Sequence, residues 1–140
     1  ERLTRLSGQK EMDAALQVLL ARANWPGHEK VTAALRGPLM RLCARYLLDR
    51  RGDGWPIDPV ARFHLKNGAR LERINWLGDV SPKGLRQSAG MMVNYRYVLD
   101  DIEQNHEAYM RDKRVTLGND VQRLLRGWKD QDGTQLRRLA

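Results

Sequence analysis

The side chains in this sequence best suited to proton transfer are its three histidines, and His64 has the most suggestive surroundings. It lies in Phe63-His64-Leu65, directly before an Asn67-Gly68 turn. An unperturbed imidazole titrates near about pH 6.5, so it can act as a general acid or base at neutral pH. The spacing leaves two interpretations open: His64 faces a cleft and does chemistry, or it caps a helix end or is hydrogen-bonded in a core. His28 and His106 lie in polar surroundings, without a partner at metal-ligand spacing.

Tyr95 and Tyr97 are predicted to share one face of a strand, because residues two apart project to the same side. Core packing fits this pattern, and so does a cleft-facing role in which a hydroxyl donates to a substrate carbonyl or carboxylate. Asn75 and Asn94 stand in strand-like runs, where asparagine is uncommon, so each either contacts a substrate or satisfies backbone groups at a strand edge. Cys43 is predicted to be inert packing on an apolar helix face, because no basic neighbour on that face lowers its pKa.

The composition restricts the class of protein. A chain of 140 residues that is 41% hydrophobic and 30% charged can bury a core, so we expect one folded domain or part of one. The single cysteine excludes a disulfide scaffold and a cysteine zinc site, and it fits a reducing compartment. The apolar runs fall far short of the roughly 20 residues of a membrane span, and no secretory signal is recognisable. We therefore expect a soluble, cytoplasmic protein without a membrane partner.

The formal net charge of +8 favours a polyanionic partner. Nucleic acid and a phosphate-rich small ligand, such as a coenzyme, both fit this charge. The arginines are dispersed among acidic residues, and neither a zinc-finger spacing nor an RNA-recognition motif is present. We therefore expect no nucleic-acid partner.

Residues 1–48 are predicted to be helical. Apolar residues recur every three or four positions in residues 8–23 and 29–36, and Gly37-Pro38 interrupts the second of these helices. Pro38 suits the first turn of a third helix, whose apolar positions form one stripe. The side chains predicted to pack along this stripe are Leu39, Leu42, Cys43, Tyr46 and Leu47.

Residues 59–128 have a different pattern, in which helices alternate with strands, and a surface loop over residues 49–59 precedes them. Strands are predicted at residues 71–76 and 91–99, and helices at 59–65, 83–89, 101–110 and 115–128. Ser81 is placed to cap the second of these helices, and residues 129–140 are expected to form a frayed tail. This order predicts an α/β or α+β fold. Two strands are too few for a free-standing sheet, so we expect upstream chain to complete it, in agreement with the missing initiator Met.

Three stretches of the chain form a recognisable set of motifs. They read Asp-Pro-Val-Ala-Arg-Phe-His-Leu-Lys-Asn-Gly-Ala over residues 58–69, Ile-Asn-Trp-Leu-Gly-Asp-Val-Ser-Pro-Lys-Gly over 74–84, and Ser-Ala-Gly-Met-Met-Val-Asn-Tyr-Arg-Tyr over 88–97. Together with residues 38–47 they closely resemble malonyl-CoA decarboxylase. The resemblance covers most of the chain and weakens after Leu99. It departs from the family at Gly78, where alanine is expected.

The resemblance implies that residues 1–140 form the C-terminal segment of one catalytic domain, similar to the Gcn5-related acetyltransferase fold. It implies that His64 is catalytic, that Tyr97 lies at the active site, and that their partner is a serine upstream of this chain. Asn75 is predicted to bind substrate together with His64. The implied reaction is the decarboxylation of malonyl-CoA to acetyl-CoA and CO₂ without a redox or metal cofactor, since CoA is part of the substrate.

Further expectations follow from the same resemblance. The chain is expected to be inactive without the upstream part of the polypeptide, and to form a homo-oligomer through a helical domain that it lacks. Some of its arginines and lysines are expected to attract the phosphates of CoA. The family also permits a mitochondrial or peroxisomal location. The alternative function is a non-catalytic module of the same fold that binds acyl-CoA or another protein.

Overall fold

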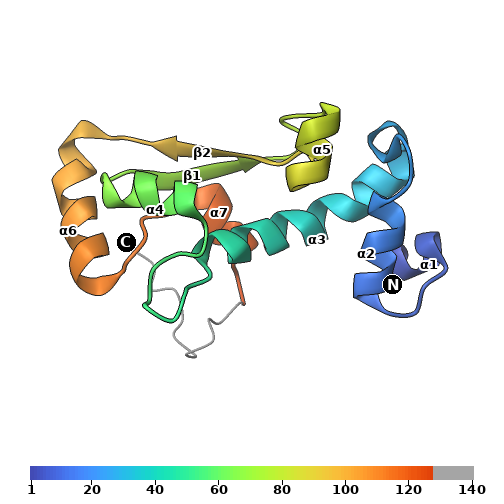
Figure 1. The fold of residues 1–140 in the computed structure, drawn as a ribbon, viewed down its shortest axis with the longest axis horizontal. Helices are drawn as coiled ribbons and strands as arrows, with labels where there is room; N and C mark the ends of the chain where they lie inside the picture. The colour runs from blue at the N-terminus through green and yellow to red at the C-terminus, as the bar shows by residue number, and fades with distance from the viewer. Residues whose placement is uncertain (128–140) are drawn as a thin grey trace. The chain divides into compact units, whose positions relative to one another are not determined.

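The computed structural model describes residues 1–127 as two compact units, drawn as a ribbon in Figure 1. The first unit comprises Glu1–Met40 and Asn75–Met92, and the second comprises Arg41–Ile74 and the residues from Val93 onward. Helices with a small sheet confirm the predicted mixed fold. Within residues 1–127, no helix combines the length and apolar character that crossing a membrane requires. The predicted tail at 129–140 and Trp128 lie outside the described residues.

The first unit is built on apolar helix faces. It contains α1 (Arg2–Ser7), α2 (Met12–Leu20), a 3-10 turn at Trp25–Gly27, the first half of α3 (Glu29–Leu48) and α5 (Pro82–Ser88). Leu16, Leu19 and Leu35 lie in its core, and Trp25 packs on Trp76 with ring centroids 6.0 Å apart. Ser81 caps α5 as predicted, since its hydroxyl accepts the Gly84 N–H at 3.0 Å, although the helix begins at Pro82, one residue earlier than expected.

The predicted break at Gly37-Pro38 is wrong, because α3 continues through Pro38 as one helix. Val31, Leu35 and Leu39 are all buried in the same core, so the apolar stripe passes from one side of Pro38 to the other. This packing offsets the cost of roughly 3 kcal/mol that an interior proline imposes on a helix. Gly37 reduces the steric conflict, since it has no Cβ to meet the proline ring.

The packing predicted for the second half of α3 is only partly correct. Leu47 is buried, but Leu42 is 46% exposed and Tyr46 is 48% exposed. The second unit instead buries Ala44 and Leu48. The prediction assumed that one apolar stripe is buried along the whole helix. In the structure each unit buries its own set of α3 side chains.

The second unit contains α4 (Pro59–Lys66), most of strands β1 (Arg70–Asn75) and β2 (Met92–Arg96), a 3-10 turn at Leu99–Asp101, α6 (Ile102–Asp112) and α7 (Asn119–Leu124). β1 and β2 pair and run in opposite directions (Figure 1). Both strands lie within the ranges predicted from sequence except that β1 begins one residue earlier.

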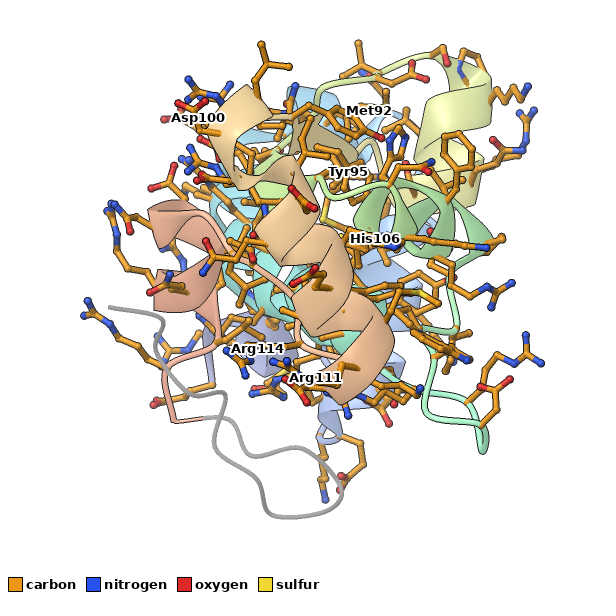
Figure 2. The ribbon with its side chains drawn as sticks, turned by 90° about the vertical axis from the view of Figure 1, so that its left-hand side faces the viewer. Met92, Tyr95, Asp100, His106, Arg111 and Arg114 are labelled. Carbon is orange, nitrogen blue, oxygen red and sulfur yellow. The ribbon has the colours of Figure 1, made fainter. Side chains whose placement is uncertain are left out.

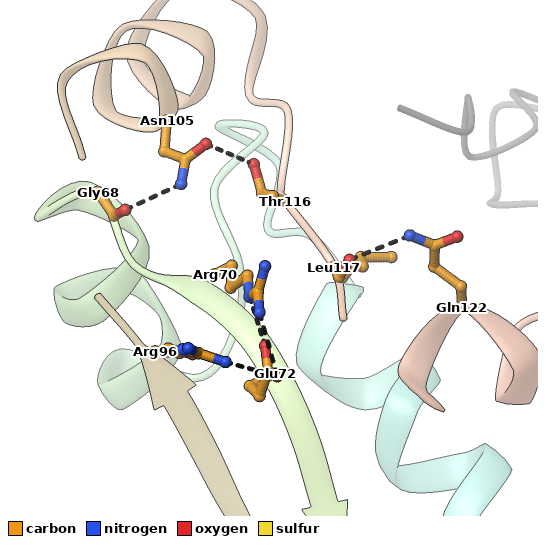
Figure 3. Close-up of polar contacts among 8 residues, drawn as sticks. All are labelled: Gly68, Arg70, Glu72, Arg96, Asn105, Thr116, Leu117 and Gln122. Carbon is orange, nitrogen blue, oxygen red and sulfur yellow. Dashed lines mark hydrogen bonds and ion pairs between the residues drawn. The ribbon is translucent and has the colours of Figure 1, made fainter. Parts of the chain in front are cut away.

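The prediction that a helix begins at residue 115 is wrong, because the segment before α7 is extended and pairs with β1. The Leu71 N–H donates to the Thr116 carbonyl at 2.9 Å, and the Gly118 N–H donates to the Leu71 carbonyl at 2.8 Å. These bonds pair residues 116–118 with the edge of β1 opposite β2, so α7 begins only at Asn119. Asn105 fixes this arrangement by donating to the Gly68 carbonyl at 3.1 Å and accepting from the Thr116 hydroxyl at 2.9 Å (Figure 3).

The loop over residues 49–58 is anchored rather than loose. Trp55 packs on Tyr109 of α6 at a centroid distance of 5.0 Å, and the Lys113 ammonium lies 3.4 Å above the Trp55 ring. The loop that leads into α4 is therefore held in place. Nearby, at the C-terminal end of α6, Arg111 and Arg114 lie close together (Figure 2), and both pair with the Asp112 carboxylate.

Candidate active site

His64 lies in the last turn of α4, whose two ends are both fixed. The Asp58 Oδ1 accepts the Ala61 N–H at 2.8 Å, and Pro59 occupies the first turn. Ala61 and Leu65 are buried, and Gly68 turns the chain out of the helix with a φ of +85°. The side chain of His64 is consequently held half-buried beside β2.

Three aromatic side chains surround the imidazole. The Tyr97 hydroxyl lies 2.8 Å from Nδ1, and the Tyr95 ring stacks on the imidazole at a centroid distance of 4.5 Å and an angle of 15°. Phe63 meets the ring edge-on at 5.2 Å. The structure thus brings together the two residues predicted to be catalytic, and it places both tyrosines of the predicted strand face on His64.

The hydrogen bond at Nδ1 determines what the other ring nitrogen can do. When the Tyr97 hydroxyl donates to Nδ1, a neutral imidazole carries its proton on Nε2 and can donate it. When Nδ1 donates to the Tyr97 oxygen, Nε2 becomes an acceptor. The Tyr97 hydroxyl engages Nδ1 and not Nε2. The arrangement therefore provides an imidazole held at Nδ1, whose Nε2 is the candidate nitrogen for proton transfer.

Asp58 gives the neighbourhood of the site a negative charge. Its Oδ2 accepts the Tyr46 hydroxyl at 3.3 Å. Burial raises the pKa of Tyr95, and the Asp58 carboxylate raises it further. Burial likewise raises the pKa of Cys43 to about 11, with a smaller contribution from Asp58. Tyr95 and Cys43 therefore stay protonated at neutral pH, and the expectation that Cys43 is inert is supported.

Cys43 should consequently react slowly with alkylating reagents. At pH 8 a thiol with a pKa of about 11 is roughly 0.1% thiolate, so we expect iodoacetamide to react on the order of 100-fold more slowly than with a free cysteine. Mass spectrometry of timed samples measures the rate, and the urea-denatured chain is the control. Asp58→Asn, which can still cap α4, should accelerate the reaction modestly. Equal rates in the folded and denatured chain would contradict the burial of Cys43.

The other predicted residues lie elsewhere. Asn75, at the end of β1, belongs to the first unit, whereas His64 and Tyr97 belong to the second. Its predicted role in substrate binding stays a prediction. A Cβ added at Gly78 would lie 2.9 Å from the Met92 Cγ, so the glycine fits the local packing at the position where the sequence departs from the family. Within residues 1–127, no three His, Cys, Asp or Glu side chains are grouped to hold a metal ion.

Sequence reasoning missed the contact between Tyr95 and His64 and the electrostatic role of Asp58. The strand periodicity identifies Tyr95 only as a companion of Tyr97 on a strand face. Asp58 directly precedes Pro59, the pattern of a helix N-cap, and this was the signal that could have identified it.

The fold and the site together define a mixed helix-and-sheet domain that presents an imidazole supported by tyrosine. Residues 4–135 match the family model described as the malonyl-CoA decarboxylase C-terminal domain, and this chain belongs to that family. It is 50% identical over 106 residues to "Malonyl-CoA decarboxylase, mitochondrial" of Anser anser anser, a match that covers 76% of this chain and 21% of that protein. The protein of the same name from Rattus norvegicus is 46% identical over 107 residues, covering 76% of this chain and 22% of the relative.

Solved structures agree with this membership. The crystal structure of malonyl-CoA decarboxylase from Rhodopseudomonas palustris matches with a TM-score of 0.74 and 43% identity, covering 89% of this chain and 29% of that one. The enzyme from Agrobacterium vitis matches with a TM-score of 0.73 and 46% identity, covering 81% and 28%. The chain thus spans about a fifth of the curated relatives and under a third of these structures. The two curated relatives are named as mitochondrial proteins, and the expected cytoplasmic location of this chain stays a prediction.

Proposed function

We propose that this chain supplies part of the active site of an enzyme that converts malonyl-CoA into acetyl-CoA and CO₂. The observation that carries the proposal is the 2.8 Å contact between the His64 Nδ1 and the Tyr97 hydroxyl, in a chain of the malonyl-CoA decarboxylase family. His64 and Tyr97 are the residues that the family resemblance implies at the site. The formal net charge of +8 suits a substrate that carries the phosphates of CoA.

The chemistry requires what this pair of side chains can supply. Cleavage of the bond between the carboxylate carbon and the methylene releases CO₂ and leaves its electron pair on the thioester as an enolate. The site must stabilise the enolate oxygen and then deliver one proton to carbon. In our proposal the proton comes from His64 Nε2, either directly or through the serine that the resemblance implies upstream of this chain. His64 gives this proton as the imidazolium, whose Nδ1–H donates to the Tyr97 oxygen, so that the neutral Nδ1–H imidazole remains and is held in orientation by Tyr97.

We propose that the upstream part of the polypeptide completes both the sheet and the site. β1 is paired on both edges, by β2 and by residues 116–118, whereas the outer edge of β2 pairs with no strand among residues 1–127. A further strand beside β2 would cover this edge, as in the Gcn5-related acetyltransferase-like domain that the resemblance implies.

An exposed apolar face supports the same partner. Leu42 and Tyr46 of α3 are 46% and 48% exposed, and Val60 and Phe63 of α4 are 54% and 62% exposed. The Tyr46–Asp58 hydrogen bond links the two helices, and Phe63 touches His64, so this face reaches the candidate site. Exposed apolar side chains that are grouped in this way are typical of a surface that another segment covers.

Charged substitutions on this face should weaken association with the upstream polypeptide. We expect Leu42→Asp and Val60→Asp each to reduce the affinity of this chain for the separately expressed upstream part by about tenfold or more, because burying an unpaired carboxylate is costly. Titration calorimetry measures the effect. Val80→Asp is the matched control, since Val80 is a 59% exposed apolar residue of the first unit. Wild-type affinity in both Leu42→Asp and Val60→Asp would exclude this face as the contact.

A product assay tests the proposed function. The chain, reunited with the upstream part of the polypeptide, should consume malonyl-CoA and release one CO₂ for each acetyl-CoA formed. The chain alone should show no turnover. Tight binding of malonyl-CoA by the folded, reunited protein without any product would instead support the alternative of a non-catalytic acyl-CoA-binding module.

A further inference from the structure

The stacking of Tyr95 on His64 is a contact of the site that the proposed chemistry does not use. The two ring planes lie at 15° with centroids 4.5 Å apart, a near-parallel arrangement. Tyr97 instead meets the imidazole at 60° with centroids 5.9 Å apart, and it bonds only the edge atom Nδ1. A hydrogen bond to one edge atom tolerates tilting of the imidazole plane and restrains it only weakly. The face of the ring therefore needs a support of its own.

We propose that Tyr95 is a positioning residue whose ring holds the plane of the His64 imidazole so that Nε2 faces the substrate, while its hydroxyl takes no part in the reaction. This inference rests on the proposed decarboxylase function. Tyr95 lies on β2, His64 lies on α4, and the two elements are fixed independently by strand pairing and by the Asp58 cap. The stack consequently fixes a catalytic side chain relative to the sheet.

The surroundings of Tyr95 suit this passive role. Burial raises the pKa of its hydroxyl most, and the neighbouring Asp58, Cys43 and Tyr46 raise it further. Tyr95 therefore remains neutral whether His64 is protonated or not. The face of a neutral tyrosine stacks on a neutral imidazole, and it also attracts the imidazolium. One support thus serves both protonation states through which a general acid must pass.

Removing the ring should lower turnover and leave binding intact. We expect Tyr95→Leu to reduce kcat about ten- to a hundredfold, the loss typical of a catalytic group displaced by about 1 Å, with KM for malonyl-CoA within about twofold. Tyr95→Phe retains the ring and should keep kcat within about threefold of wild type. The assays use this chain reunited with the upstream part of the polypeptide. Tyr109→Phe is the matched control, because Tyr109 is a buried tyrosine of the second unit that packs on Trp55.

Two kinetic results would overturn the inference: a folded Tyr95→Leu protein with wild-type kcat, or a Tyr95→Phe protein as impaired as Tyr95→Leu. NMR of the 140-residue chain provides a test that does not depend on turnover or on the folding of the leucine variant. We expect nuclear Overhauser contacts between the ring protons of His64 and Tyr95, and upfield shifts of the imidazole protons. Their absence in the folded wild-type chain would also overturn it. If the reunited wild-type protein shows no turnover while these contacts are present, the proposed function fails and the stack itself stands.

Discussion

Replacing His64 by asparagine should abolish most of the decarboxylation. We expect kcat to fall about 10²- to 10⁴-fold, the usual contribution of a general acid or base, because asparagine cannot release a proton at neutral pH. The asparagine amide still reaches the position of Nδ1, so the contact with Tyr97 can be kept and the fold should not change. Rates of acetyl-CoA formation measured at equal concentrations of folded protein give the effect.

His28→Asn is the control for this substitution. His28 is exposed and lies in the first unit, next to the 3-10 turn at Trp25–Gly27. This variant should turn over like wild type. A His64→Asn protein that folds by circular dichroism and retains a tenth or more of wild-type kcat would show that His64 does not carry the proton transfer.

Replacing Gly68 by alanine should strongly destabilise the chain. Gly68 has a φ of +85°, and a Cβ there would collide with the backbone carbonyl of Ile102 and approach its Cγ2 to 2.8 Å. Backbone strain and this collision together should lower the free energy of unfolding by about 3–5 kcal/mol. Urea denaturation followed by circular dichroism measures the loss. Because Gly68 ends the helix that carries His64, we expect turnover to fall as well.

Gly54→Ala separates the two causes. Gly54 has a similar φ of +82°, but an added Cβ would meet only the flexible end of Lys113, at 3.0 Å. This variant should lose about 1 kcal/mol, the cost of the positive φ alone. Equal losses in the two variants would mean that the close approach of α6 to Gly68 is not present in solution.

Local sequence signals predicted the helix ends that are marked by capping or turn residues. Asn67-Gly68 marked the end of α4, and Ser81 marked the start of α5, because caps and turns depend on residues adjacent in sequence. The prediction failed at Pro38, where a local rule for helix breaking was overridden by burial of Leu35 and Leu39 on either side. It failed again before α7, because nothing in residues 115–118 reveals that their backbone pairs with Leu71.

The candidate site was predictable in its residues but not in its geometry. The local sequence made His64 a candidate, but only the family resemblance gave it a catalytic role, since spacing alone favours a histidine that caps a helix end or is hydrogen-bonded in a core. The shared face of Tyr95 and Tyr97 followed from strand periodicity, and both rings lie on His64. The stacked and edge-on roles of the two tyrosines depend on how α4 lies against β2, which is a tertiary property that no short pattern encodes.

The most direct test of the central claim is the reaction of malonyl-CoA with the reunited protein in deuterium oxide, followed by mass spectrometry of the product. The proposed enolate must take one proton from a site in exchange with solvent. We predict acetyl-CoA with a single deuterium in its methyl group at early times, released together with an equal amount of CO₂. Formation of free CoA and malonate, or no product at all from the folded protein, would contradict the assignment of this chain to a malonyl-CoA-decarboxylating site.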